Sequence, residues 1–403
     1  MKKNINKPKL PRRNLLIYAL TLLFSILFLL VGNHIAQGGR QIFGGAGEAE
    51  ILQARVLQIT NETQSSYDVT GMGENTNTTR VITFTARLRS GENKRKTITA
   101  TQELNDLYGQ QSFPVQVGDT ILLDVVRENT EQGEGELQYV MLDFARTTPL
   151  LILAAFYALV VLFFARKKGF DTLLSMGITI LAIFTVLLPA VLTGRSIYGW
   201  TMIICAFVVL TNLLLVQGVN AKSLTAAAGC LGGLLFPGLI AMVMKGPMHL
   251  TGLMDEEAVM LTYLDPPLNV QATISCMFLI GCVGALMDIS MTIASALHEI
   301  REKEPNLPAR ELMHSGNSIG KDLIGTMANT LVLAFIGGSM SEILLLVNYS
   351  ANASQVLNKE MIAVEILQSL ASCFSVVLTI PLTSFLCALF GRGGKGKVTV
   401  EYE

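Results

Sequence analysis

Residues 150–168 read LLILAAFYALVVLFFARKK, and this stretch decides the class of the protein. An uncharged apolar run is followed at once by three basic residues, Arg166, Lys167 and Lys168. A helix of about 20 apolar residues crosses the roughly 30 Å of hydrocarbon in a bilayer, and basic residues gather on the cytoplasmic side of such helices. The stretch therefore predicts a membrane-spanning helix whose end faces the cytoplasm.

Comparable apolar runs recur through the chain. They lie near residues 15–32, 150–165, 173–192, 198–216, 224–244, 270–289, 323–340 and 364–389. Charged residues make up only 15% of the chain, against about a quarter in soluble domains. We therefore expect a polytopic α-helical membrane protein with about eight spans, embedded in the lipid bilayer of the cell membrane.

The first run follows a tail rich in Lys and Arg, so it is either a signal peptide or an anchor. A cleaved signal peptide has a shorter apolar core and a cleavage site of small residues directly after it. Residues 32–36, Gly-Asn-His-Ile-Ala, provide no such site, and the run is long enough to span. We expect an uncleaved anchor with the N-terminus inside.

Residues 34–147 are polar and differ in pattern from the rest of the chain. From Val81 to Arg89 apolar and polar residues alternate, which is typical of a strand with one buried face. Further short strands are expected at residues 52–59, 97–101, 121–126 and 138–144. This pattern predicts a small β-rich domain, a barrel or an OB-like fold. Its simplest role is structural or the binding of a protein partner.

The basic residues predict which side each loop faces. Arg166, Lys222, Arg301 and Arg392 follow the second, fourth, sixth and last spans, so alternate loops share the side of the basic N-terminal tail. The predicted domains are a cytoplasmic tail with its anchor (1–33), an extracytoplasmic β-rich domain (34–147), a seven-span membrane domain (148–391) and a cytoplasmic tail (392–403). Both termini should be cytoplasmic.

Composition and motifs argue against several classes of function. A formal net charge of -1 without a basic groove argues against nucleic acid as a partner. The six cysteines lie in apolar runs and form no CxxC pair, so we interpret them as buried apolar residues. The loop from His249 to Glu257 holds a histidine and three carboxylates, but Thr251 with Asp255 and Glu256 is more typical of a helix start. We expect no metal and no cofactor.

Polar residues inside or beside a span are the best candidates for function, because they are expensive in lipid. Asp288 lies near the cytoplasmic end of the sixth predicted span, where it either has a functional role or simply ends the helix. The seventh span opens with a polar stripe and a neighbouring lysine, namely Lys321, Asp322, Thr326, Asn329 and Thr330. We interpret these six residues as a substrate or ion pathway that lines one cavity between the two spans. The alternative is polar contact between packed helices.

Small residues and prolines also occur in the spans. Gly229 with Gly233, and Gly281 with Ala285, have the spacing of closely packed helices, and Gly337-Gly338 lies in the seventh span. The prolines at 189, 237 and 381 kink their spans or lie at their ends.

The most specific segment is Gly-Lys-Asp-Leu-Ile-Gly-Thr-Met-Ala-Asn-Thr-Leu at residues 320–331. Together with Gly-Ala-Leu-Met-Asp at 284–288, Ser-Ala-Leu-His-Glu-Ile at 295–300 and His-Leu-Thr-Gly at 249–252, it resembles the YibE/F family of bacterial multi-pass membrane proteins. The resemblance covers most of the chain after about residue 80. One departure is Lys321, where we expect arginine, so a planar two-pronged guanidinium is replaced by an ammonium group. The resemblance implies the location and architecture, and members are commonly described as predicted permeases.

Three functions compete. A permease of unknown substrate agrees with the polar residues of the sixth and seventh spans, whereas a non-transporting scaffold or sensor would use the outer domain for a partner and residues 294–320 for signalling. An intramembrane aspartyl protease would need Tyr-Asp and Gly-x-Gly-Asp, but Asp288 follows methionine and Asp322 follows lysine. We expect a permease rather than an enzyme.

The predicted topology can be tested with reporters. Reporter proteins fused after Ser90 and after Lys168 should report opposite sides of the membrane, because one predicted span separates the two positions. Activity of the same reporter at both positions would contradict the topology.

Overall fold

The computed structural model describes residues 12–38, 51–68, 76–91, 94–105, 113–130, 133–264 and 266–390. The chain divides into two compact units, one of residues 43–161 and the other of residues 1–42 with 162–403. The predicted cytoplasmic tail at 392–403 and the first part of the basic N-terminal tail lie outside the described residues.

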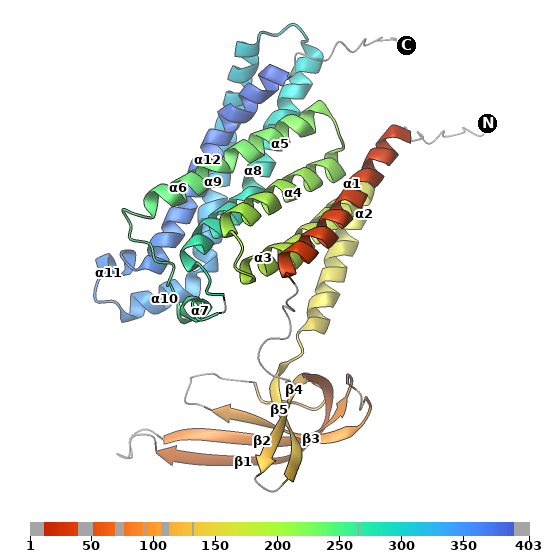
Figure 1. Cartoon of the computed structure of the whole chain (residues 1–403), viewed down its shortest axis with the longest axis vertical. Helices are drawn as coiled ribbons and strands as arrows, with labels where there is room; N and C mark the ends of the chain where they lie inside the picture. Colours follow the sequence, from red (N-terminus) through yellow and green to blue (C-terminus); the bar gives the residue numbers. More distant parts are fainter. Residues whose placement is uncertain are drawn as a thin grey trace, which may run out of the picture. The chain divides into compact units, whose positions relative to one another are not determined.

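The smaller unit contains a closed five-stranded β-barrel (Figure 1). Its strands are β1 (Leu52–Asp68), β2 (Thr76–Leu88), β3 (Thr97–Asn105), β4 (Thr120–Thr130) and β5 (Gly133–Phe144). They follow one another around the barrel in the order β1-β2-β3-β5-β4, and β1 pairs with β4 to close it. All pairs are antiparallel except β3 with β5. The expected barrel is confirmed.

Alternating side chains form the core of the barrel. On β2, Ile82, Phe84 and Leu88 are buried, while Arg87 between them is exposed, as the sequence pattern predicts. Side chains from β1 and β4 complete this core, among them Val56 and Leu123. Because successive residues of a strand point to opposite faces, one alternating run fixes which side faces the core.

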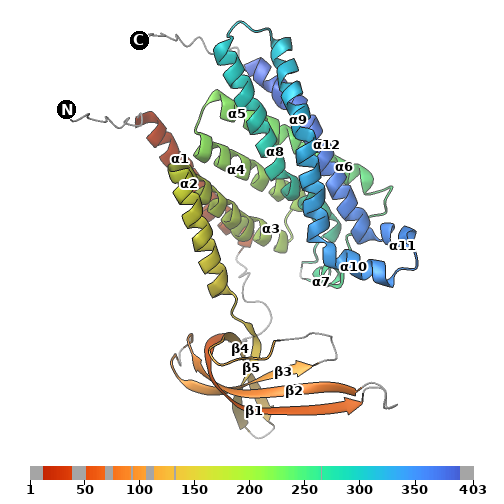
Figure 2. The same cartoon turned by 180° about the vertical axis from the view of Figure 1, so that it is seen from behind.

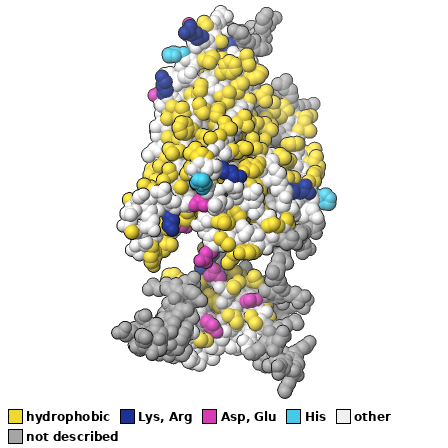
Figure 3. Space-filling model, turned by 60° about the vertical axis from the view of Figure 1, so that its left-hand side comes forward, with side chains coloured by type: hydrophobic (Ala, Val, Ile, Leu, Met, Phe, Trp, Pro, Cys, Tyr) yellow, Lys and Arg dark blue, Asp and Glu magenta, His cyan; other side chains and the backbone are white. Residues whose placement is uncertain are grey.

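The larger unit is helical and is formed by most of the remaining chain (Figure 1). Its elements are α1 (Arg12–Gln37), α2 (Thr147–Ala182), η2 (Ile183–Leu187), α3 (Leu188–Leu192), α4 (Ile197–Gln217), α5 (Ala221–Gly233), α6 (Leu235–Met244), α7 (Glu256–Leu261), α8 (Val270–Lys303), α9 (Ala309–Gly338), α10 (Met340–Tyr349), α11 (Ala353–Leu357) and α12 (Glu360–Phe390), although α2 begins in the smaller unit. In the face drawn in Figure 3, hydrophobic side chains form a broad band over this unit. Within the described residues, seven helical segments are long and apolar enough to cross a membrane.

One of these seven segments contains two of the predicted spans. Thr147–Leu192 has 46 residues, but its backbone leaves the helical conformation at Arg166, where φ is 48° and ψ is -120°. At a rise of 1.5 Å per residue, the parts before and after this break are roughly 28 and 39 Å long, so each can cross a bilayer alone. The break coincides with the basic residues that separate the two spans in the sequence.

The first span packs against the other helices through polar and aromatic contacts. The hydroxyl of Tyr18 donates a hydrogen bond of 2.9 Å to Asp171, whose side chain is buried on α2. Phe28 stacks on Phe207 of α4 with ring centroids 4.0 Å apart. A carboxylate buried in a membrane domain needs such a partner, so Asp171 gives α1 a specific docking position.

Charged residues distinguish the two ends of the helical unit. We call one the basic end: it holds the α4–α5 and α8–α9 connections, with Lys222, Arg301, Lys303 and Arg310. The opposite end, which we call the acidic end, holds α7, α10 and α11, with Glu256, Glu257, Glu342 and Glu360 nearby. Helix α1 begins and α12 ends at the basic end (Figure 1).

The barrel should fold without the helical unit, because it has its own closed core. A soluble fragment of residues 46–146 is expected to give a β-type circular dichroism spectrum with a cooperative thermal transition. Phe84→Ala should lower its free energy of unfolding by about 3–5 kcal/mol, since it empties a fully buried position. The matched change Arg87→Ala on the exposed face should stay within about 0.5 kcal/mol. A disordered or mainly helical fragment would contradict the autonomous core.

Candidate functional site

Helix α12 is held between α5 and α9 by two pairs of glycines. On α5, a side chain at Gly229 or Gly233 would overlap Thr383 or Thr379 of α12. This confirms the packing predicted for that pair.

A second glycine pair, Gly316 and Gly320, was not singled out in the sequence. A side chain at Gly316 of α9 would overlap Ser384 of α12, and one at Gly320 would overlap Ile380. Such close approach is the usual device by which helices associate in a membrane. By contrast, a Cβ added at Gly337 or Gly338 would meet no atom of the described residues within 4 Å, so these two glycines make no such close helix contact there.

The glycine contacts determine which face of α9 is exposed. Because Gly316 and Gly320 face α12, the opposite side of the helix points outward, and α9 lies in front of α12 in Figure 2. The predicted site residues Lys321, Asp322, Thr326, Asn329 and Thr330 are all exposed there. The hydroxyls of Thr326 and Thr330 donate to backbone carbonyls of their own helix at 3.0 and 2.8 Å.

Helix α8 presents an outward face of the same kind. Phe278, Leu286 and Ile293 are buried, whereas Gly281, Gly284, Asp288 and Thr292 on the other side are exposed. This pattern follows the helical period, in which residues three or four apart share a face.

Asp288 lies at the level of the stripe on α9. The two helices are antiparallel, with Gly281 beside Phe335 at one point and Leu297 beside Gly316 at another. With an equal rise per residue in both helices, Asp288 is level with about residues 326–327. We call Asp288, Lys321, Asp322, Thr326, Asn329 and Thr330 the polar face.

The six side chains of the polar face are all exposed in the structure of the single chain. That they line one cavity between the sixth and seventh spans stays a prediction. Among the described residues, neither carboxylate of the polar face forms an ion pair. The prediction placed these residues on adjacent helices correctly, but the glycine packing turns them away from the helix interface.

A pocket at the acidic end contains polar groups that the sequence analysis missed. It has a volume of about 290 Å³ and is lined by Met277, Ala334, Phe335, Gly338, Ser339, Glu342, Met361, Glu365 and Gln368. We call it the acidic pocket, because its charged residues are two glutamates from α10 and α12. The available signal was Glu365 with Gln368, three residues apart within an otherwise apolar run.

Gln368 is the buried member of the acidic pocket. Only 5% of its surface is exposed, and its Nε2 donates a hydrogen bond of 3.4 Å to the carbonyl of Met277. Its Oε1 has no hydrogen-bond partner among the described residues. A buried acceptor without a partner costs about 1–3 kcal/mol.

One face of α8 connects the acidic pocket with the polar face. Met277 lines the pocket, and Asp288 follows Gly281 by two helical turns. A Cβ atom added at Gly281 would lie 2.7 Å from Nε2 of Gln368. Gly284 between them has no atoms within 4 Å of where a Cβ would lie. From Met277 to Asp288 this face extends about 16 Å along the helix, and glycine occupies two of its positions, 281 and 284.

The His-Leu-Thr-Gly loop has a structural role at the acidic end. The carboxylate of Glu360 accepts hydrogen bonds from the backbone N–H groups of Thr251 and Gly252 at 2.6 and 2.7 Å, and from the Thr251 hydroxyl at 2.7 Å. Gly252 has a φ of +85° and lies against the backbone of Val270, where no side chain fits. The short helix expected from Thr251, Asp255 and Glu256 is α7, and its N-cap is Asp255, whose carboxylate accepts a hydrogen bond from the backbone N–H of Ala258.

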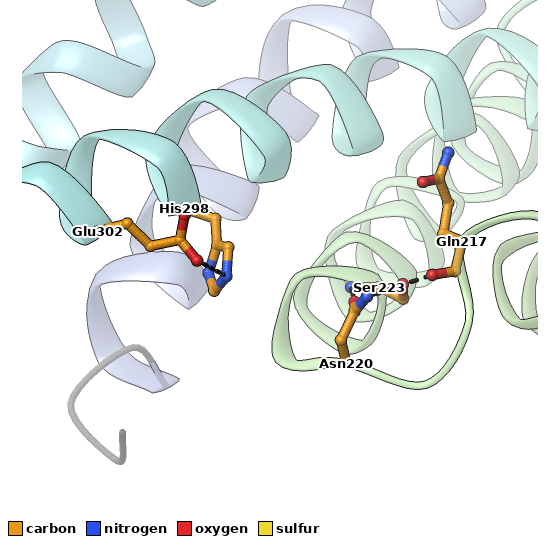
Figure 4. Close-up of polar contacts among 5 residues, drawn as sticks. All are labelled: Gln217, Asn220, Ser223, His298 and Glu302. Atoms are coloured by element: carbon orange, nitrogen blue, oxygen red, sulfur yellow. Dashed lines mark hydrogen bonds and ion pairs between the residues drawn. The ribbon is translucent and has the colours of Figure 1, made fainter. Parts of the chain in front are cut away.

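Polar residues at the basic end mainly cap helices (Figure 4). Asn220 accepts hydrogen bonds from the backbone and hydroxyl of Ser223 at 2.9 and 2.7 Å, and donates to the carbonyl of Gln217. His298 lies 3.4 Å from Glu302 one turn along α8. A hollow of about 30 Å³ beside Lys222, His298 and Arg301 holds one or two waters at most.

Residues 316–320 read Gly-Asn-Ser-Ile-Gly, which matches the Gly-x-Ser-x-Gly spacing of serine hydrolases. In those enzymes the serine lies on a sharp turn between a strand and a helix. Here Ser318 is inside α9, and both glycines pack against α12. The spacing therefore reflects helix packing.

Comparison with known families places these helices in a family. The model of the family described as YibE/F-like protein matches residues 153–393. The chain belongs to the YibE/F-like family. The match includes every residue of the polar face and of the acidic pocket, while the barrel strands of this YibE/F-like protein precede it. No curated protein and no solved structure matched the chain.

Two glycines of α9 offer a matched test of the packing. Gly320→Ala places a methyl group against Ile380, so it should lower the stability of the helical unit by about 1–3 kcal/mol. The methyl group of Gly325→Ala would meet no atom of the described residues within 4 Å. This variant should leave the stability unchanged or raise it by up to about 1 kcal/mol. Thermal unfolding of the purified protein in detergent measures both. Equal stabilities would contradict the proposed contact between α9 and α12.

Proposed function

We propose that this YibE/F-like multi-pass membrane protein is a permease whose solute moves along the outward faces of α8 and α9. The observation that carries the proposal is the exposed position of Asp288 and Asn329 on apolar membrane helices, in line with the acidic pocket. A charged side chain at the centre of a bilayer costs at least about 2.5–3.5 kcal/mol, so such residues generally line a cavity or a solute path.

The route begins at the acidic pocket and follows α8. It passes Gly281, beside which the side chains of Phe335 and Gln368 lie, and then Gly284, where an added Cβ would meet no described atom within 4 Å, and it reaches Asp288 beside the polar stripe of α9. Asp322 and Lys321 lie further toward the basic end. The break between α5 and α6 at Leu234, near Pro237, adds support, because discontinuous helices often occur at transport sites.

The polar face needs a cover in the membrane, and a second copy of the chain provides one. Unpaired polar groups do not face lipid, because the bilayer offers them no hydrogen bonds. Lys321 and Asp322 are neighbours, so a two-fold axis through this face places the lysine of each copy near the aspartate of the other. Gly325 leaves room for close approach.

The basic end is cytoplasmic in this proposal, and the barrel is extracytoplasmic. The basic residues at the connections favour this orientation through the positive-inside rule. Both chain ends then lie inside, and solute enters or leaves at the acidic end. A non-transporting scaffold accounts less well for the polar face, because partner binding does not require carboxylates on membrane-facing surfaces.

Charge-removing variants test the proposed route. Asp288→Asn and Asp322→Asn should each fail to restore the ion and metabolite profile of cells that lack the protein, with a loss of at least about tenfold in flux. The control Glu311→Gln changes a carboxylate in the first turn of α9, the helix that also carries Asp322, but outside the apolar part of that helix. It should restore the profile. Membrane levels of each variant must match the native protein. Full restoration by both aspartate variants would remove the route.

The same profiles separate the permease from the scaffold. A permease predicts that specific solutes or ions change in concentration when the protein is absent. An unchanged profile would favour a non-transporting role.

A further inference from the structure

The acidic pocket has the composition of a cation site. Its polar side chains are Glu342, Glu365, Gln368 and Ser339, and neither Lys, Arg nor His is among the residues that line it. Glu342 accepts a hydrogen bond of 3.3 Å from Ser341, and neither glutamate forms an ion pair with a described residue. Two carboxylates on neighbouring helices therefore leave negative charge without a counter-ion.

Gln368 is an independent sign of a ligand. It is almost completely buried in the wall of the pocket, and its Oε1 has no hydrogen-bond donor within the described chain. Nε2 donates to the Met277 carbonyl, which leaves the oxygen as the unpaired atom of the amide. This oxygen is almost completely covered as well as unpaired, so a turn of the amide toward the pocket, where a cation or a water that the cation holds would meet it, would recover the free energy that the missing partner costs.

We propose that the acidic pocket binds a hydrated divalent cation of the oxygen-preferring class, such as Mg²⁺ or Mn²⁺. The volume of about 290 Å³ is far larger than a bare ion needs. Mg²⁺ gives up its water reluctantly and commonly binds through one or two carboxylates while it keeps several waters. Carboxylate and amide oxygens also favour this class over soft ions such as Cu(I), although Met277 and Met361 border the pocket.

This site deepens the proposed function, because it names the class of solute that the permease would take. Asp288 lies on the same face of α8 and offers the next carboxylate along the proposed route. The binding claim nevertheless stands on the pocket alone.

Binding is tested with Mn²⁺ on the purified full-length protein in lipid nanodiscs. The paramagnetic resonance signal of free Mn²⁺ disappears as the ion binds, so titration gives both the number of sites and the Kd. We expect one saturable site per chain, from which Mg²⁺ displaces Mn²⁺. Glu342→Gln and Glu365→Gln should each raise the Kd by at least about tenfold, since each removes a charged ligand.

Two further variants sharpen the test. Gln368→Glu adds a negative charge and replaces the Nε2 donor to the Met277 carbonyl by an oxygen, so it should lower the Kd for Mn²⁺, because a cation would relieve the repulsion between the new carboxylate and that carbonyl. Glu257→Gln removes an exposed carboxylate of α7 at the same end, outside the pocket, and should leave the Kd unchanged. Thermal unfolding without metal confirms that each variant is folded, and Gln368→Glu keeps the test decisive if either glutamine variant fails to fold.

Several results would overturn the site. The first is the absence of saturable Mn²⁺ binding, and the second is an unchanged Kd in the double variant Glu342→Gln, Glu365→Gln. Displacement of Mn²⁺ by Cu(I) or by an organic ammonium ion, but not by Mg²⁺, would overturn the class. Saturable binding without flux in cells would contradict the permease and support the site. Flux in cells together with unchanged Mn²⁺ binding in the double variant would support the permease and contradict the site.

Discussion

The close contact of α12 with α5 and α9 is the constraint on which the helical unit depends. Four glycines, two on each neighbouring helix, let the backbone approach the hydroxyl-bearing and branched side chains of α12. Helices in a bilayer gain little from the hydrophobic effect when they associate, so shape and close packing determine their rotation. Once Gly316 and Gly320 face α12, residues on the other side of α9, such as Asp322 and Asn329, face outward.

The outward polar residues differ in how completely the chain satisfies them. Threonine hydroxyls donate to carbonyls of the preceding turn, so they are stable on any face of a membrane helix. An ionised carboxylate only accepts, and the N–H groups inside a helix are already used, so it needs water, a cation or another chain; the oxygen of a carboxamide has the same need. Asp288, Asp322 and Asn329 therefore carry more functional information than Thr326 and Thr330, although all five share the same surface.

The two ends of the helical unit provide different chemistry. At the acidic end, the Glu360 carboxylate accepts hydrogen bonds from the backbone N–H groups of Thr251 and Gly252. Glu342 and Glu365 instead line the acidic pocket. At the basic end, Asn220 caps a helix and His298 meets Glu302, so the polar groups are largely paired. In the proposed permease, these pairings would leave the acidic end as the open entrance of the solute path.

The sequence by itself determined the spans, the strands and the polar residues of α8 and α9, because hydrophobic period and run length are local properties of the chain. Ile82, Phe84, Ala86 and Leu88 face the barrel core as their alternation predicts, and the break at Arg166 lies where basic residues separate two apolar runs. The tertiary structure decided the rotation of each helix, since this depends on contacts such as Gly320 with Ile380, which are far apart in the sequence. For the same reason it alone assembled the acidic pocket, which joins Met277, Glu342 and Gln368 from three separate helices.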